Sequence, residues 1–301
     1  MEPAATSWDK TTEALISFAH KASYESLSAD VVHACKLRVI DAFASALGAY
    51  DNPTSVLARK VAARSRTDDE HAATVWGSNI KTTPEAAAFT NGVMVRLLDI
   101  SDTYLGKSRG HPSDMISGIL AVAQSVRADG KSVINAITLA QDGFTGPTAV
   151  FEGDGGLWEV IGHHDWPLPQ NEHLITHTHL KCLPICYHGQ SAVFAALDLR
   201  KSVAVNDIVE MRSDERLTAL YPEAAPARVS VRTKAGQTRS AEVLYPRGHA
   251  KNPLSDADVL DKFHELTAAK LSQTQRAGVL DTLSQLERVD DVAAVIKKLS
   301  A

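Results

Sequence analysis

An apolar stripe with helical spacing recurs through the first 140 residues and is the feature that most constrains the fold. In residues 30–49 the apolar side chains are three and four positions apart, which places them on one face of a helix. A helix start is expected at 83–85, where threonine can cap, proline fits the first turn and glutamate lies near the positive helix end. Residues 112–126 and 132–140 carry further stripes. Because alanine is abundant and only 6% of residues are aromatic, these helices can pack closely.

The second half of the chain indicates a different mixture of elements. Residues 141–169 hold six glycines and three prolines and are expected to form a loop. A helix is predicted over 189–201 and a strand over 203–211. The alternating segments 227–233 and 238–245 flank a turn that contains glycine, which is typical of a β-hairpin.

The end of the chain returns to helices. Ser255 and Asp258 form a capping pattern at a helix start, and helical segments are predicted over 271–286 and 289–299. No repeat of 20–50 residues is visible. The order of helices, a small α/β part and further helices predicts a mainly α protein with a smaller α+β domain inserted into the helical one.

Charge and cysteine content exclude several classes of protein. The formal net charge of −5 gives no support to nucleic-acid binding, which favours a basic face. No run of 18 apolar residues exists, and the first ten residues resemble neither a secretory signal nor a transit peptide, so we expect no membrane association. Three cysteines, at 35, 182 and 186, cannot pair completely, which favours a reducing, cytoplasmic location.

The segments 98–103 and 110–114 form the first candidate site. Asp99 follows an apolar helix, and His111 directly precedes a helix start, where backbone N–H groups and the helix dipole favour an anion. A histidine there can transfer protons near neutral pH. The alternative interpretation is that Asp99 and Asp102 are helix caps and that His111 is an ordinary loop residue.

A histidine-rich stretch between residues 163 and 188 is the second candidate. His177, His179, Cys182 and Cys186 have the residue types of a zinc site, but their spacing is not that of a common zinc motif. In a second interpretation only Lys181 and His188 are functional, and Lys181 contacts an anion. In a third, the stretch is a surface loop whose histidines have no function. The segments 245–249 and 252–255 form a third candidate, which the proline and glycine content indicates is a rigid connection.

The motifs together resemble those of the MmgE/PrpD family. The specific part is Asn-Gly-Val-Met-Val-Arg-Leu-Leu-Asp-Ile-Ser-Asp-Thr-Tyr at 91–104 with Gly-His-Pro-Ser-Asp at 110–114. Segments 143–153, 181–192, 217–222 and 252–255 have counterparts in the same order.

The resemblance implies a fold, a reaction and an assembly. The implied fold is a helical domain, residues 1–180 and 250–301, with an α+β lid, residues 181–249, and an active site between them in a homodimer. The implied enzyme is a lyase that uses no metal and no organic cofactor. It eliminates water from a small tricarboxylate such as 2-methylcitrate, as in propionate metabolism.

The resemblance also assigns the site residues. His111 is expected to transfer the proton, Lys181 to contact a substrate carboxylate and Asp99 to orient or relay. Thr103 is expected to hydrogen-bond the substrate. In the lid, Cys186 and His188 match substrate-binding positions.

Two departures from the family pattern indicate internal losses. Family members are longer, and the sequence passes from one family segment to another between residues 140 and 141 and again near 211–214. The alternative function is therefore a catalytically impaired or inactive shortened paralogue, or the product of a mis-joined gene model. Loss of packed helices also predicts an exposed apolar patch beside the first junction.

Overall fold

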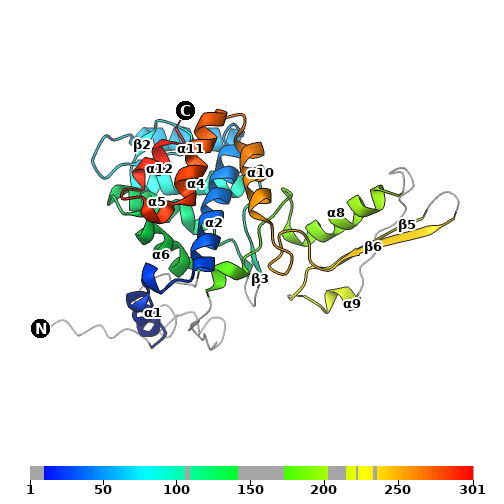
Figure 1. Cartoon of the computed structure of the whole chain (residues 1–301). Helices are drawn as coiled ribbons and strands as arrows, with labels where there is room; N and C mark the ends of the chain where they lie inside the picture. Colours follow the sequence, from blue (N-terminus) through cyan, green and yellow to red (C-terminus); the bar gives the residue numbers. More distant parts are fainter. Residues whose placement is uncertain are drawn as a thin grey trace, which may run out of the picture.

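The computed structural model describes residues 10–105, 109–141, 173–202, 215–221, 223–232 and 236–300. A body of packed helices carries a smaller arm that projects from one side (Figure 1). The prediction of a mainly α protein is confirmed, because the strands of the described residues form only two-stranded sheets. No helix in these ranges combines the length and apolar character that crossing a bilayer requires.

Helix α2 (Ala29–Gly48) lies at the centre of the body and is buried along most of its length. It packs against α4 (Pro84–Leu97) and α10 (Asp256–Thr267), which approach it from distant parts of the sequence. The ring of Phe43 meets Trp76 edge-on, with ring centroids 4.6 Å apart. This contact fixes the α2 surface against the segment that precedes α4, and edge-to-face aromatic pairs stabilise a core beyond simple burial.

Local capping fixes the starts of these helices, and the starts at Thr83 and Ser255 agree with the sequence prediction. The Ser28 side chain accepts a hydrogen bond from the Val31 amide at the start of α2, and Thr83 caps α4 ahead of Pro84. Ser255 and Asp258 form a capping box on α10.

The remaining elements of the body cover this centre. They are α1 (Lys10–Lys21), η1 (Tyr24–Ser26), α3 (Pro53–Ala62), η2 (Ala63–Ser65), the antiparallel pair β1 (Ala73–Thr74) and β2 (Lys81–Thr82), the antiparallel pair β3 (Tyr104–Leu105) and β4 (Arg109–Gly110), α5 (Asp114–Ser125), α6 (Gly130–Gln141), η3 (Leu174–His177), α11 (Gln273–Ser284), η5 (Leu286–Arg288) and α12 (Ala293–Lys297).

The arm has a small core of its own. Helix α8 (Tyr187–Arg200) packs against the antiparallel hairpin β5 (Ala227–Arg232) and β6 (Thr238–Val243), in which Ala227 pairs with Val243. Ala195 and Leu199 of α8 contact Val229 and Val231 of β5. On the hairpin, Glu242 pairs with Arg228 and with Arg216 of the short helix α9 (Glu215–Thr218). The predicted hairpin is thereby confirmed.

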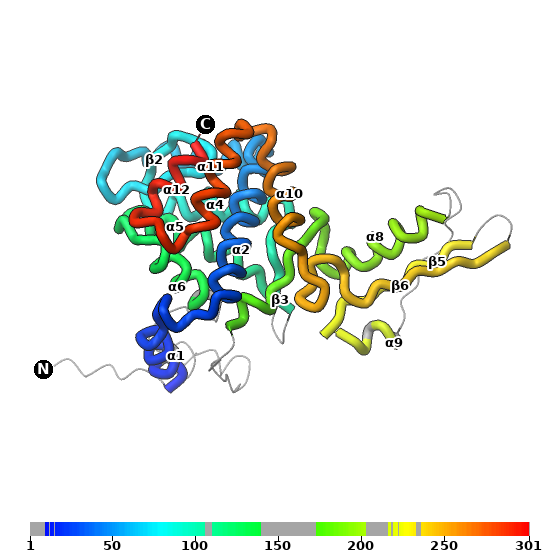
Figure 2. Tube along the Cα trace, in the orientation of Figure 1, coloured from blue at the N-terminus to red at the C-terminus, as the bar shows by residue number. Residues whose placement is uncertain are grey.

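Two neighbouring chain segments join the arm to the body, one near residue 180 and one near residue 248 (Figure 2). The Leu180 amide donates to the Gly248 carbonyl over 3.0 Å, and the Gly248 amide donates to the Asn252 carbonyl. Gly248 has a φ of 93°, in the left-handed region that favours glycine. A Cβ atom at Gly248 would lie 1.7 Å from the Leu180 carbonyl oxygen. The close approach of the two segments therefore depends on this glycine.

Gly248→Ala is expected to lower the free energy of unfolding by about 3 kcal/mol or more, because both backbone strain and the carbonyl clash must be relieved. Gly236→Ala is the matched control. It has a φ of 79°, but nothing lies within 4 Å of its added Cβ, so only strain of about 1 kcal/mol is expected. Denaturant unfolding of both variants checks this, and equal losses would contradict the role of the Leu180 contact.

Several predicted boundaries need correction. Helix α5 begins at Asp114 rather than at Pro112, because the Asp102 carboxylate accepts from the Ser113 amide and holds residues 112–113 in a turn. The final segment 289–299 is helical only over Ala293–Lys297. Residue 141 still belongs to α6, while the rest of the predicted loop and the predicted strand over 203–211 lie outside the described residues.

Candidate active site

Asp99 lies just beyond the end of α4, in an unusual backbone conformation. Its φ is 49°, the left-handed region that few residues other than glycine adopt, although aspartate tolerates it better than most. The turn directs the chain away from the helix, and Arg96 in the last turn of α4 contacts the Asp99 carboxylate over 3.2 Å. The helix end thus presents a carboxylate at a fixed position.

Lys181 comes from the segment that joins the body to the arm and meets this carboxylate. Its Nζ lies 2.6 Å from Asp99 Oδ1 and 3.5 Å from the carbonyl oxygen of Ile185. The Lys181 side chain is only 1% exposed, whereas the Asp99 side chain is 39% exposed. Solvent therefore reaches this ion pair mainly through the Asp99 carboxylate.

The electrostatic environment keeps this carboxylate ionised. Partial desolvation by itself would raise the pKa of Asp99, but the hydrogen bond from Lys181 and the charges of Lys181 and Arg96 outweigh it and lower that pKa. At neutral pH the structure accordingly presents an Asp99–Lys181 ion pair beside a second cation, Arg96.

Thr103 holds the loop after α4 against the segment that carries Lys181. Its amide donates to the His179 carbonyl over 2.8 Å, and the His179 amide donates back over 2.7 Å. The Thr103 hydroxyl donates to the Gly110 carbonyl over 3.3 Å, and the residue is buried. Thr103 therefore joins the two segments through its backbone, and its predicted hydrogen bond to substrate stays a prediction.

A hydrogen bond holds the His111 ring against the loop that follows α4. Its Nδ1 lies 2.7 Å from the Asp102 carbonyl oxygen. A carbonyl can only accept, so Nδ1 carries the hydrogen and the neutral imidazole has its lone pair on Nε2. The ring is half-buried, and Nε2 is the atom that can take up a proton. Asp102 itself is fully buried, and burial raises the pKa of its carboxyl group.

The two predicted lid residues lie at the start of α8. Cys186 precedes the helix, and its Sγ is 4.0 Å from Nδ1 of His188; both residues are exposed. The His188 ring also lies 5.2 Å from that of Tyr221. Since Ile185 contacts Lys181 through its carbonyl, this end of α8 adjoins the Asp99–Lys181 pair.

The structure gives no support to the zinc interpretation. In the described ranges no three His, Cys, Asp or Glu side chains are grouped so that they could hold a metal ion. His179 is instead buried, with its Nδ1 accepting from the Ala250 amide over 2.8 Å. Burial, together with the nearby His249 and Arg38, lowers the pKa of His179 to about 3.

This shift predicts a loss of stability in mild acid. His179 stays neutral in the folded chain but gains a proton in the unfolded chain below a pKa of about 6.5, so acid favours unfolding. Between pH 7 and pH 5 the contribution of His179 amounts to about 2 kcal/mol. His179→Gln keeps an acceptor for Ala250 and should remove this part of the pH dependence, measured by urea unfolding at both pH values. An unchanged dependence in the variant would contradict it.

Sequence reasoning missed three charged residues of this region. Arg96 lies within the family motif but was given no role, and Asp41 and Lys262 form an ion pair in the body at 2.5 Å. In the sequence, Asp41 and Lys262 are marked only as charged side chains within the apolar stripes of predicted helices. Such a residue needs a buried partner, but a single stripe does not reveal which one.

The fold and the site define a class: a mainly helical body with an α+β arm and an Asp–Lys pair where the two join. Family models for the MmgE/PrpD N-terminal domain and the MmgE/PrpD C-terminal domain match residues 13–140 and 203–286. The chain therefore belongs to the MmgE/PrpD family. The N-terminal match ends at residue 140, where the sequence predicts the first loss.

Curated relatives match over short stretches. A stretch of 51 residues is 49% identical to the 2-methylcitrate dehydratase of Salmonella typhimurium and represents 17% of this chain and 11% of that enzyme. Another of 84 residues is 34% identical to the mitochondrial 2-methylcitrate dehydratase of Yarrowia lipolytica, 28% of this chain and 16% of that enzyme. A stretch of 49 residues is 49% identical to the 2-methylcitrate dehydratase of Escherichia coli K12 and represents 16% of this chain and 10% of that enzyme. The matched stretches thus span a small part of these relatives.

Proposed function

We propose that the chain is a hydro-lyase of the 2-methylcitrate dehydratase type, which eliminates water from a small tricarboxylate in propionate metabolism without a metal or an organic cofactor. The observation that carries the proposal is the contact of Lys181 with Asp99 beside the loop that holds His111. Membership of the MmgE/PrpD family and the names of the matching relatives support the same reaction.

The chemistry required is removal of a proton from a carbon beside a carboxylate, followed by departure of a hydroxyl group. Nε2 of His111 accepts the proton, because its Nδ1 is fixed as a donor to the Asp102 carbonyl. Lys181 is buried behind Asp99, so its contact with the substrate carboxylate requires the ammonium to move out past Asp99. There it would stabilise the negative charge that develops on that carboxylate. The departing hydroxyl group takes up a proton, which the His111 imidazolium can return, and leaves as water, so the products are an unsaturated tricarboxylate and water.

The other site residues support these steps. Asp99 orients the Lys181 ammonium and can relay a proton, since its carboxylate is partly exposed and in contact with that ammonium. Cys186 and His188, exposed at the start of α8, are proposed to contact the distal part of the substrate from the lid. We retain residues 181–249 as that lid and the remaining residues as the helical domain.

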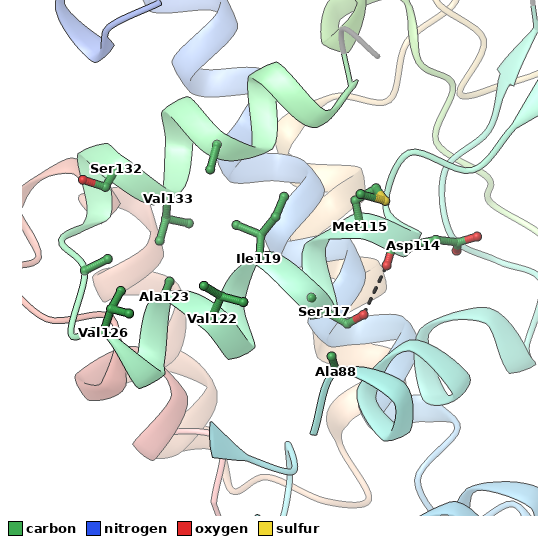
Figure 3. A pocket seen from close by; sticks show the side chains of 13 residues that line it. Ala88, Asp114, Met115, Ser117, Ile119, Val122, Ala123, Val126, Ser132 and Val133 are labelled. Carbon is green, nitrogen blue, oxygen red and sulfur yellow. Dashed lines mark hydrogen bonds between the residues drawn. The ribbon is translucent and has the colours of Figure 1, made fainter. Parts of the chain in front are cut away.

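The proposal includes a cytoplasmic homodimer. All three cysteines are free, and Cys35 is buried, as is common for proteins of a reducing compartment. Helices α5 and α6 line an apolar groove with a volume of about 630 Å³, which Figure 3 shows from close by. Met115, Val122 and Val126 of this groove are exposed, and a second protomer that covered them would gain hydrophobic stabilisation.

The same groove favours the alternative function, a shortened chain without activity. It lies on the two helices that precede the junction at residues 140–141, where loss of a packed segment predicts an uncovered apolar face. Sedimentation distinguishes the two explanations: a dimer that binds little hydrophobic dye supports the interface, and a dye-binding monomer supports the loss.

A turnover assay tests the proposed reaction. Purified protein is incubated with 2-methylcitrate and, separately, with cis-aconitate, and the products are measured beside a longer dehydratase of the family. Formation of the unsaturated acid from 2-methylcitrate supports the proposal. No turnover under conditions in which the longer enzyme works would favour the inactive alternative.

A further inference from the structure

A buried ammonium group lies beneath the candidate site. Lys262 belongs to α10, and its side chain is almost completely buried against α2. Its Nζ is 2.5 Å from Oδ1 of Asp41, whose side chain is also buried. Removing both charges from water is costly, and a buried ion pair frequently stabilises a fold no better than apolar residues of similar size. The pair therefore calls for an explanation other than stability.

The other two contacts of Lys262 provide that explanation. Its Nζ donates to the Ile100 carbonyl over 2.7 Å and to the Lys181 carbonyl over 2.9 Å. Ile100 is the residue directly after Asp99. One ammonium group thus binds the backbone on both sides of the Asp99–Lys181 contact, next to the carboxylate on one side and at the lysine itself on the other.

The chemistry of lysine fits this position closely. An ammonium has three hydrogens and no acceptor, and Asp41, Ile100 and Lys181 use all three. Asp41 balances the charge, so the group can remain ionised among buried residues. A methionine side chain could fill the space but has no N–H group to donate to the two carbonyls.

We propose that Lys262 is a positioning residue that holds the Asp99 turn and the Lys181 segment in register, so that the two side chains of the candidate site stay in contact. It does not touch the substrate. The effect on turnover rests on the proposed function, whereas the effect on the Asp99–Lys181 contact does not. The two parts are therefore tested separately.

The contact is tested by titration of the Asp99 carboxyl carbon with NMR. In Lys262→Met the pKa of Asp99 should rise toward that of an ordinary aspartate, because the loosened Lys181 ammonium interacts with it less; Arg96 remains as the other charge that faces Asp99. Phe263→Leu is the matched control on the same helix. It leaves a gap in the core, so it should lower the melting temperature without moving the Asp99 titration.

A double variant separates positioning from simple stability. Asp41→Leu with Lys262→Met removes both charges of this pair and should regain part of the stability lost in Lys262→Met, while the Asp99 titration stays shifted. This variant also serves if Lys262→Met does not fold. An Asp99 titration that is unchanged in folded Lys262 variants, or shifted equally in Phe263→Leu, would overturn the inference.

Turnover provides the second test. If the parent chain dehydrates 2-methylcitrate, the folded Lys262 variant should lose about 100-fold in kcat, as expected when catalytic groups are displaced by about 1 Å. Phe263→Leu should keep the parent value at a temperature where it is folded. A parent chain without activity contradicts the proposed function alone, since the titration still reports on the positioning. An active parent whose Lys262 variant keeps full kcat contradicts the positioning role.

Discussion

His111→Ala is expected to lower kcat for 2-methylcitrate by about 10²–10⁴-fold, the range typical of a general acid–base residue. The reason is the tautomer: Nδ1 donates to the Asp102 carbonyl, so Nε2 is the ring nitrogen that can accept the proton. The variant should remain folded, because the lost hydrogen bond contributes only about 1 kcal/mol. Steady-state kinetics and a thermal melt measure both quantities.

His71→Ala is the matched control for this measurement. Its Nδ1 also lies near a backbone carbonyl, that of Ser125 at 3.0 Å, but the residue is exposed and belongs to another part of the body. Its kcat should equal that of the parent. Equal rates in the parent and in His111→Ala would remove His111 from the mechanism.

Asp41→Asn is expected to lower the free energy of unfolding by about 3–5 kcal/mol, because it leaves the buried Lys262 ammonium without a counter-charge. Such a loss is a large fraction of the stability of an ordinary domain, about 5–15 kcal/mol. Urea unfolding at neutral pH measures it.

An exposed ion pair supplies the comparison. Asp198 and Lys201 contact each other over 2.8 Å on the surface of α8, with side chains 56% and 78% exposed, so Asp198→Asn should cost less than about 1 kcal/mol. If Asp41→Asn cost no more than Asp198→Asn, the Asp41–Lys262 pair would not be the buried, charge-dependent contact described above.

Local features of the sequence determine most of the helical body. The stripe of α2, the caps at Thr83 and Ser255 and the alternation of the hairpin strands all act over two to four residues, and the structure contains each of them. Correct elements follow because spacing and capping satisfy backbone hydrogen bonds and bury apolar faces without reference to distant residues. The start of α5 differs because the Asp102 carboxylate, eleven positions earlier in the chain, accepts a hydrogen bond from the Ser113 amide.

The candidate residues follow from the motifs, but their arrangement does not. Lys181 meets Asp99 across 82 positions of the chain, and Lys262 meets Asp41 across 221. Spacing in the sequence carries no information about which loop lies opposite which, so the ion pairs, the Thr103–His179 pairing and the charge state of Asp99 emerge only from packing. Local spacing and capping account for the helices, the hairpin strands and the list of polar residues near two helix ends. The tertiary structure decided which of those residues touch, because charge partners in a core are set by the docking of α2, α4 and α10 and not by any local preference.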